Sequence, residues 1–451
     1  MKNQVHALTV SKIVQNSAET RNNYDTIVFK DDTIIDIGYK ADLEKNYSFD
    51  TFEELPNTVI IPGMVNTHTH SIQAFFRGIA ENAQLLDWLN TVILPGEASL
   101  KTGEEVYASS LLGFVDMVSH GTTFSNDMIT THHSESGIQA ALDIGIRIKT
   151  GKLLMDVGPY NLVEDTHFAI EETYHLIDKY HNKFPLLEYS INPRFLVSSS
   201  PALMKFCGQI LKENPTLSFH THASENKAEV ELVESLHGKY IKSLDDYGVL
   251  GDRSILAHGI WLDSSDINLL ATTNTAISHC PSSNAKLASG ICDWPTLESY
   301  HIPVGLGTDG PPSNNTMDMF REMRLATFLQ RVQSLDETMA PSQKVFDLAT
   351  VNGAKALRRP DIGTIETGKK ADFLVIDISH PSNYPIHNYI NHLVFKASGN
   401  DVLRTYIGGK LVYNSSAPSY DKMFPVIPTG KLAKSLKIAK SYVENKSWLI
   451  N

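Results

Sequence analysis

Two histidines, His68 and His70, stand one residue apart at the end of MVNTHTH, a short apolar run of the kind that forms a buried β-strand. Side chains two positions apart on a strand point to the same face, so both imidazoles can reach one cation. Because such a pair also arises by chance, it predicts a metal site only together with other ligands. Catalytic zinc and iron(II) sites combine two or three imidazoles with a carboxylate and leave one position open.

Further side chains that bind metals or transfer protons lie at the ends of other strand-like runs. Barrel enzymes place their active sites at the C-terminal ends of the strands, so this common location predicts one catalytic centre. The residues are His220, His222 and Glu225 in LSFHTHASE, His258 in SILAHGIWL, His279 in TAISHCPSSN and Asp309 in IPVGLGTDG.

Two of these histidines also fit a structural role. His220 faces the same way as His222 but lies two residues deeper in the strand, so we expect a packed, hydrogen-bonded core side chain. His279 precedes Cys280-Pro281, and we expect it to be structural too. We expect Cys280 to be a small buried residue.

The elements that position these residues alternate between strand and helix. Eight strand-like runs separated by amphipathic segments occupy residues 62–356, which predicts a closed (β/α)8 barrel of the TIM type as the catalytic domain. An open doubly wound sheet gives the same alternation, but no GxGxxG or P-loop turn accompanies it here. The runs are MVNTHTH, GTTFSNDM, RIKTGKLLMD, LLEYSINPRF, LSFHTHASE, SILAHGIWL, TAISHCPSSN and IPVGLGTDG.

Both ends of the chain have strand and turn character. Residues 1–61 contain three such runs, with a tight turn near Asp31-Asp32, and residues 357–451 return to the same pattern. We expect the two ends to pair into one small β-sandwich domain, because unpaired strand edges would otherwise be exposed. The final stretch, GKLAKSLKIAKSYVENKSWL, predicts a solvated surface helix with a lysine-rich face.

Composition narrows the class of protein. The 451 residues carry a formal net charge of −12, which argues against a nucleic-acid or anionic-membrane surface. Three irregularly spaced cysteines do not make a disulfide framework. Neither a signal peptide nor a long apolar run is evident. The sequence therefore predicts a soluble, cytoplasmic protein with a small-molecule partner and no nucleic-acid or membrane partner.

Several motifs, in order and in combination, resemble those of the amidohydrolase superfamily in its chlorohydrolase and deaminase branch. The likeness extends from about Thr58 to Val412 and is closest to deaminases of S-adenosylhomocysteine, methylthioadenosine and 5′-deoxyadenosine. It implies a hydrolytic deaminase of a purine-type heterocycle that releases ammonia. The motifs are IPGMVNTHTH, HTHASENKAEV, AHGIWL, SHCPSSNAKLASG and GLGTDGPPSNN.

The resemblance also implies roles for individual residues. It makes Glu225 the proton shuttle between water and the ring nitrogen, and His258 a group that holds the attacking oxygen. Asp309, besides binding the metal, would take the remaining hydroxyl proton on its free oxygen. The implied ligands of one divalent ion, zinc or alternatively iron(II), are His68, His70, His222 and Asp309.

A single ion is favoured over two. Two-metal relatives usually bridge their ions with a modified lysine on the fourth strand, and LLEYSINPRF contains no lysine. Lys149 and Lys152 lie one strand too early. One ion favours deamination over hydrolysis of a ring amide, although a halide or ring-amide hydrolase, a catalytically inactive scaffold and a nucleoside-binding protein are rival interpretations.

The choice of substrate depends on three further residues. Trp88 and Glu97 match a tryptophan that lines the pocket and a glutamate that binds ribose hydroxyls, but also fit a packing aromatic and a helix N-terminal carboxylate. Pro193-Arg194-Phe195 resembles guanine deaminases, and Arg194 could bind a ring acceptor, a substrate carboxylate or an acidic residue. An adenosine derivative is preferred, with guanine, pterin and s-triazine substrates as alternatives. Relatives suggest a homo-oligomer, dimer or tetramer.

Overall fold

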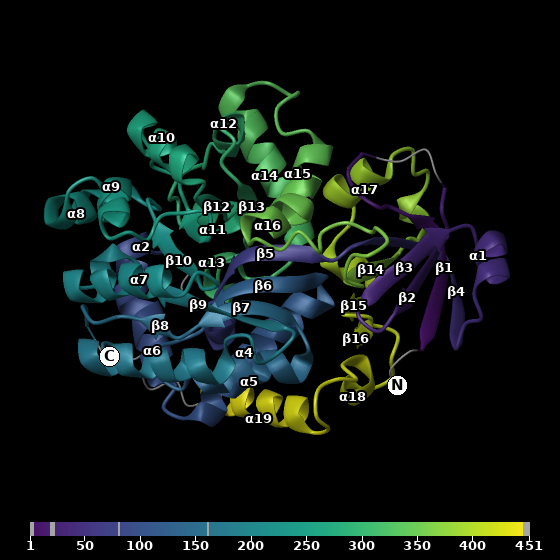
Figure 1. Cartoon of the computed structure of the whole chain (residues 1–451), viewed down its shortest axis with the longest axis horizontal. Helices are drawn as coiled ribbons and strands as arrows, with labels where there is room; N and C mark the ends of the chain where they lie inside the picture. Colours follow the sequence, from purple (N-terminus) through teal and green to yellow (C-terminus); the bar gives the residue numbers. More distant parts are fainter. Residues whose placement is uncertain (1–3, 19–22, 80–81, 160–161, 445–451) are drawn as a thin grey trace.

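The computed structural model describes residues 4–18, 23–79, 82–159 and 162–444. It contains a nearly closed barrel of eight parallel strands and a separate seven-stranded sheet beside it (Figure 1). The barrel predicted from the eight strand-like runs is therefore confirmed.

The barrel strands follow one another in chain order around the barrel. The first and last strands meet where Asp309 N–H donates to the carbonyl of His68 at 3.0 Å, and Thr69 forms a parallel bridge with Asp309. A short strand, β8 (Leu153–Leu154), pairs with the end of β9. The barrel strands are β5 (Met64–Thr69), β6 (Thr122–Met128), β7 (Arg147–Gly151), β9 (Leu187–Pro193), β10 (Ser218–Ala223), β11 (Ser254–His258), β12 (Ala276–His279) and β13 (Val304–Leu306).

Helices cover the outside of the barrel, and local sequence sets their starts. In α7 (Pro201–Glu213), the Ser200 hydroxyl accepts from the N–H of Leu203, and proline occupies the first turn. In α8 (Lys227–His237), Asn226 and Glu229 form a capping box directly after Glu225. The remaining helices here are η1 (Ser71–Phe76), α2 (Leu85–Trp88), η2 (Leu89–Ile93), α3 (Leu94–Ser99), α4 (Gly103–Ser119), α5 (Ser134–Ile144), α6 (Thr166–Tyr180), η3 (Leu196–Ser198), α9 (Tyr240–Asp246), α10 (Ser264–Thr273), α11 (Pro281–Lys286), α12 (Trp294–Ser299), α13 (Pro311–Asn314), α14 (Met319–Ser334), α15 (Ser342–Ala349) and α16 (Val351–Ala356).

The second sheet takes its strands from both ends of the chain, in the order β16-β15-β14-β4-β1-β2-β3. Phe29 on β2 contacts Phe373 on β14 with ring centroids 5.5 Å apart, although three strand steps of about 4.8 Å separate these strands in a flat sheet. The expected β-sandwich is therefore one sheet folded over its own apolar face. Its strands are β1 (Val5–Ile13), β2 (Thr26–Lys30), β3 (Thr33–Gly38), β4 (Thr51–Pro62), β14 (Phe373–Asp377), β15 (Val402–Ile407) and β16 (Lys410–Asn414).

The helices outside the barrel's repeating units pack on both parts of the structure. The C-terminal helix, α19 (Lys431–Glu444), lies along α4 of the barrel (yellow in Figure 1). Leu432 and Ser435 are buried, so the prediction of a solvated helix is wrong for this face. Among the described residues, no helix has both the length and the apolar character that crossing a membrane requires. The other helices are α1 (Lys40–Asn46), η4 (Pro381–Asn383), α17 (Tyr389–Phe395), η5 (Gly399–Asp401) and α18 (Tyr420–Met423).

The division of the chain into residues 1–61, 62–356 and 357–451 stays a prediction. Its outer parts correspond to the strands of the folded sheet, whereas α17 and α19 contact barrel helices.

Candidate metal centre and active site

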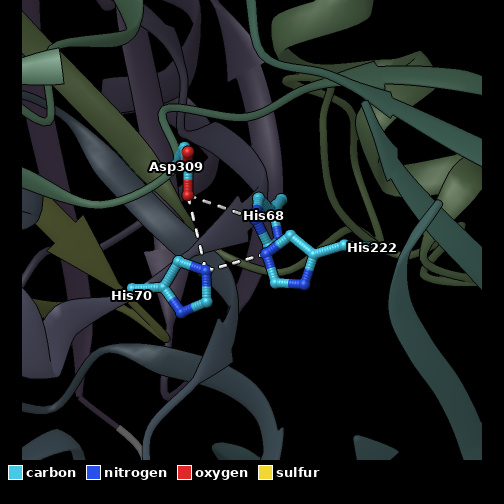
Figure 2. Close-up of side chains that lie close together, drawn as sticks. All are labelled: His68, His70, His222 and Asp309. Atoms are coloured by element: carbon cyan, nitrogen blue, oxygen red, sulfur yellow. Dashed lines mark hydrogen bonds and ion pairs between the residues drawn. The ribbon is translucent and has the colours of Figure 1, made fainter. Parts of the chain in front are cut away.

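Four side chains predicted as metal ligands converge at the C-terminal mouth of the barrel (Figure 2). His68 and His70 come from the end of β5, His222 from β10, and Asp309 from the segment after β13. Each offers one ligand atom, and these atoms all lie within 4.8 Å of one another. All four side chains are buried.

Three of the distances between these atoms are close to those expected around a single cation. The Nε2 atoms of His70 and His222 are 3.0 Å apart, and Asp309 Oδ1 lies 3.3 Å from His68 Nε2 and 3.4 Å from His70 Nε2. Ligands bound tetrahedrally at 2.0–2.1 Å lie about 3.3 Å from one another. His68 Nε2 is buried and, apart from this approach to Asp309, has no hydrogen-bond partner among the described residues. Three imidazoles and one carboxylate in this arrangement fit one divalent metal ion.

Hydrogen bonds at the opposite ring nitrogens orient the three imidazoles. His68 Nδ1 lies 2.8 Å from His220 Nε2, and His222 Nδ1 donates to the Arg194 carbonyl at 2.7 Å. His70 Nδ1 faces another main-chain carbonyl at 3.2 Å. Burial is the main reason that the pKa of each of these ligands is lowered, well below the usual range for His70 and His222. Neutral rings with Nε2 turned inward are the form that binds metals.

The carboxylate of Asp309 is held by two hydroxyls. Its Oδ2 accepts from Ser283 Oγ at 2.6 Å and from Ser313 Oγ at 2.8 Å, while Oδ1 faces the histidines. The expectation of a free oxygen on Asp309 is therefore wrong. Burial opposes ionisation, but the hydrogen bond and charge of His68 keep the pKa of Asp309 well below its usual range.

Glu225 and His258 stand beside the ligand cluster. The Glu225 side chain is 8% exposed, and its Oε2 lies 3.5 Å from His258 Nε2. Burial, together with the charges of Asp309 and Glu229, raises the pKa of Glu225 well above its usual range. His258 Nδ1 donates to Asn284 Oδ1 at 2.8 Å, which leaves its Nε2 facing Glu225. A buried carboxyl group with a raised pKa can accept and return a proton near neutral pH.

A pocket opens over these groups. His70, His222, Glu225, His258 and Asp309 line its floor. One side is apolar and is called here the apolar wall, formed by Leu85, Trp88, Leu89 and Phe195. Of these, only Trp88 was predicted as a pocket residue.

Arg194 lines the pocket and is bound to Glu97 behind it. Its guanidinium donates to both Glu97 oxygens at 3.0–3.3 Å, and the two side chains are 3% and 1% exposed. Of the three partners considered for Arg194, the structure pairs it with the acidic residue. Glu97 also accepts from Gln73 Nε2 at 2.8 Å. Gln73 was missed; its signal is a lone amide in the apolar run SIQAFF, three residues after His70.

The other histidines and lysines lie outside the metal cluster. His220 is a hydrogen-bonded core side chain, as predicted. His279 is buried with no hydrogen bond at either ring nitrogen among the described residues, and burial lowers its pKa to about 3. Lys149 Nζ donates to the Leu357 carbonyl at 2.9 Å, and Lys152 Nζ to Glu164 at 2.8 Å.

Comparison with known families agrees with this geometry. Residues 59–412 match the model of the Amidohydrolase family. The chain belongs to the amidohydrolase family. It is 37% identical to the 5-methylthioadenosine/S-adenosylhomocysteine deaminase of Thermococcus kodakarensis over 389 residues, which cover 85% of this amidohydrolase and 90% of that relative. It is also 37% identical to the 5′-deoxyadenosine deaminase of Methanothermobacter thermautotrophicus, covering 80% and 84% of the two chains.

Solved structures of similar proteins have the same fold. An adenosine deaminase from Xanthomonas campestris with bound zinc superimposes with a TM-score of 0.88, at 25% identity, over 98% of each chain. The guanine deaminase of E. coli gives a TM-score of 0.83 at 27% identity, over 92% of this amidohydrolase and the whole of that chain. The amidohydrolase is thus a hydrolase of the class that acts on C–N bonds.

Proposed function

We propose that this amidohydrolase is a metal-dependent deaminase that hydrolyses an adenosine derivative and releases ammonia. Its candidate substrates are S-adenosylhomocysteine, methylthioadenosine and 5′-deoxyadenosine. The observation that carries the proposal is the buried Glu225 carboxyl group beside a set of three imidazoles and one carboxylate. The activities for which the relatives at 37% identity are named support the substrate class.

We further propose that the ion is zinc, with iron(II) as the alternative. Three nitrogen donors and one oxygen donor suit either metal, and a neighbouring structure contains zinc. His68, His70, His222 and Asp309 would hold it. A divalent ion in this position supplies Lewis-acid activation of water at neutral pH.

In this proposal, the protein side chains move the protons. Glu225 accepts a proton from the attacking water and passes it to the ring nitrogen next to the amino-bearing carbon, which makes that carbon electrophilic. His258 Nε2, fixed by Asn284, orients the oxygen that adds to the ring. The remaining hydroxyl proton of the tetrahedral intermediate passes through Asp309 to the amino group, which leaves as ammonia when the carbonyl forms. Because Asp309 Oδ2 already accepts from two serines, Asp309 can take the last proton only by giving up one of these bonds.

Trp88, Glu97 and Arg194 are proposed to select the substrate. Trp88 offers an aromatic face within the apolar wall for the heterocycle. Glu97 would accept from ribose hydroxyls on lone pairs left free by Arg194 and Gln73, and thereby fix the sugar.

Guanine, pterin or an s-triazine is the second candidate substrate. The specific observations that favour guanine are the Pro193-Arg194-Phe195 segment and the similarity to E. coli guanine deaminase. Arg194 would then donate to the oxygen of the ring amide, using the N–H groups that do not bind Glu97.

Ammonia release tests the proposal. Purified protein supplied with zinc should release ammonia from at least one of the three adenosine derivatives faster than from guanine, pterin or a triazine. Glu225→Gln should lower kcat by about 10²–10⁴-fold with the metal content unchanged. Glu231→Gln, on the exposed side of α8, is the matched control and should keep full activity. Faster turnover of guanine, or an active Glu225→Gln variant, would contradict the proposal.

We also propose that the protein acts in the cytoplasm as a homodimer or homotetramer. Cys207, Cys280 and Cys292 are buried and unpaired, which suits a reducing compartment. Light scattering of the purified protein measures its oligomeric state. A monomer at cellular concentrations would contradict the proposed homodimer or homotetramer.

A further inference from the structure

The C-terminal helix α19 returns from the folded sheet to the barrel and packs on α4 and η1. One face carries Leu432, Ser435, Ala439 and Tyr442 towards the barrel, and the lysines of the helix lie on the exposed face. Ile438, Ala439 and Tyr442 pack against the apolar cluster formed by η1 and α4. The helix therefore contacts a segment that directly follows the metal ligand His70.

Tyr442, near the end of this helix, contacts two separate segments at once. Its ring lies 5.1 Å from the Phe75 ring and 6.0 Å from the Phe76 ring of η1, centroid to centroid. Its hydroxyl is 2.7 Å from Ser99 Oγ at the end of α3. Ser99 Oγ also lies 2.6 Å from the Gly96 carbonyl, so this hydroxyl pair joins the end of α19 to the last turn of α3.

These two segments carry residues that support one side of the pocket. Gln73 lies in η1 and Glu97 in α3, and they are joined by a hydrogen bond of 2.8 Å. Glu97 holds Arg194, which lines the pocket. The Phe76 ring packs directly on Gly96, where an added Cβ would come within 3.2 Å of it. A shift of either segment would therefore move Glu97 and Arg194.

The local sequence gives α3 little stability of its own. It is the last segment of one continuous helical run from Leu85 to Ser99 whose middle is the π-helix η2, and a run of about 15 residues is marginal in water without tertiary contacts. Packing from outside the segment must therefore hold it in place. Among the described contacts, Tyr442 supplies both a ring against η1 and a hydrogen bond to α3.

We propose that Tyr442 is a positioning residue: through it, α19 clamps η1 and α3 and so fixes the Gln73–Glu97–Arg194 side of the substrate pocket. Tyr442 touches neither substrate nor metal ligands in this proposal. The inference rests on the proposed function only in taking this pocket as the substrate site.

Three variants test the proposal in the full-length, metal-loaded protein. Tyr442→Ala removes the ring and the hydroxyl, Tyr442→Phe removes the hydroxyl alone, and Val443→Ala changes the neighbouring side chain, which is 52% exposed. Amide hydrogen exchange in η1 and α3 should become about tenfold faster in Tyr442→Ala and about threefold faster in Tyr442→Phe, but stay unchanged in Val443→Ala and in β10. KM should rise about tenfold in Tyr442→Ala, with kcat within twofold and metal content unchanged.

Two results would overturn the proposal. One is that amide hydrogen exchange in η1 and α3 and KM are unchanged in Tyr442→Ala. If Tyr442→Ala does not fold, unchanged exchange and KM in Tyr442→Phe overturn the proposal instead. The other is an equal loss of kcat, metal and exchange protection throughout the barrel, which would mark a general structural role. If the wild-type protein releases no ammonia from any adenosine derivative, the proposed function fails, while the exchange measurement still decides the role of Tyr442.

Discussion

The buried ion pair between Glu97 and Arg194 gives a prediction whose size follows from the structure. Glu97→Gln would leave the guanidinium without a counter-charge in a side chain that is 3% exposed. Charges centred about 4 Å apart attract by about 4 kcal/mol at an effective dielectric constant of 20. Removing one partner of such a pair costs about 3–5 kcal/mol. We therefore expect each of Glu97→Gln and Arg194→Met to lower the free energy of unfolding by about 3–5 kcal/mol.

The double variant should lose much less than the sum of the single losses. Removing both charges leaves no unpaired ion, and a methionine fills much of the volume of the arginine stem. We expect a coupling energy of at least about 2 kcal/mol between the two positions. Urea unfolding of the wild type, the two single variants and the double variant measures this coupling energy. The zinc concentration must be the same throughout, because bound metal itself adds stability.

The same four proteins show whether the pair serves substrate binding. If the pair only holds the pocket, KM should follow the loss of stability and recover partly in the double variant. If Glu97 accepts from ribose hydroxyls, the double variant should regain stability but keep a high KM for nucleosides. Losses that simply add, within about 0.5 kcal/mol, would refute the reasoning that the two charges neutralise each other.

Three further predictions concern the metal, the substrate and pH. His220→Ala removes the hydrogen bond to His68 and should weaken zinc affinity about 10–100-fold in a chelator competition; unchanged affinity would contradict the orienting role. Because the apolar wall lines the pocket and Arg194 is already paired, kcat/KM should be at least tenfold higher for methylthioadenosine than for S-adenosylhomocysteine, and equal values would count against this view. Burial raises the pKa of Glu322 to about 7, from 4.5. The protonated folded form is therefore favoured, and its contribution of about 3 kcal/mol is complete below pH 4.5 and lost as pH rises to about 7. In urea unfolding, the free energy of unfolding of Glu322→Gln should not show this decrease between pH 4.5 and 7. If the variant shows the same decrease, Glu322 is not its source.

The barrel and the ligand positions could be predicted because each rests on a local pattern. His68 and His70 show the two-residue strand period, and Asp309 follows the eighth strand-like run. The C-terminal ends of parallel barrel strands meet at one mouth, so residues far apart in sequence are brought together by the fold itself. The strand period alone did not distinguish His222 from His220; the deeper position of His220 in the strand and the resemblance to the amidohydrolase superfamily did.

Contacts between side chains on different loops could not be predicted in this way. Nothing local in the sequence says that Arg194 turns towards Glu97, or that Ser283 and Ser313 occupy the second oxygen of Asp309. The folding of the second sheet over its apolar face could not be predicted either, because strand patterns indicate pairing but not curvature. For α19, the lysine-rich pattern indicated an exposed face, but it did not show that Tyr442 would be held on the other side.

Two buried carboxyl groups in one pocket have pKa values shifted in opposite directions, and this difference separates their roles. Asp309 lies among hydroxyls and imidazoles, which favour its charged form despite burial. Glu225 is buried near Asp309 and Glu229, and both carboxylates oppose its ionisation. A group held charged suits a cation ligand, whereas one held near neutrality suits proton transfer. The same His–His–His–Asp set could serve other hydrolytic reactions, so it is the placement of Glu225 that makes deamination the favoured chemistry.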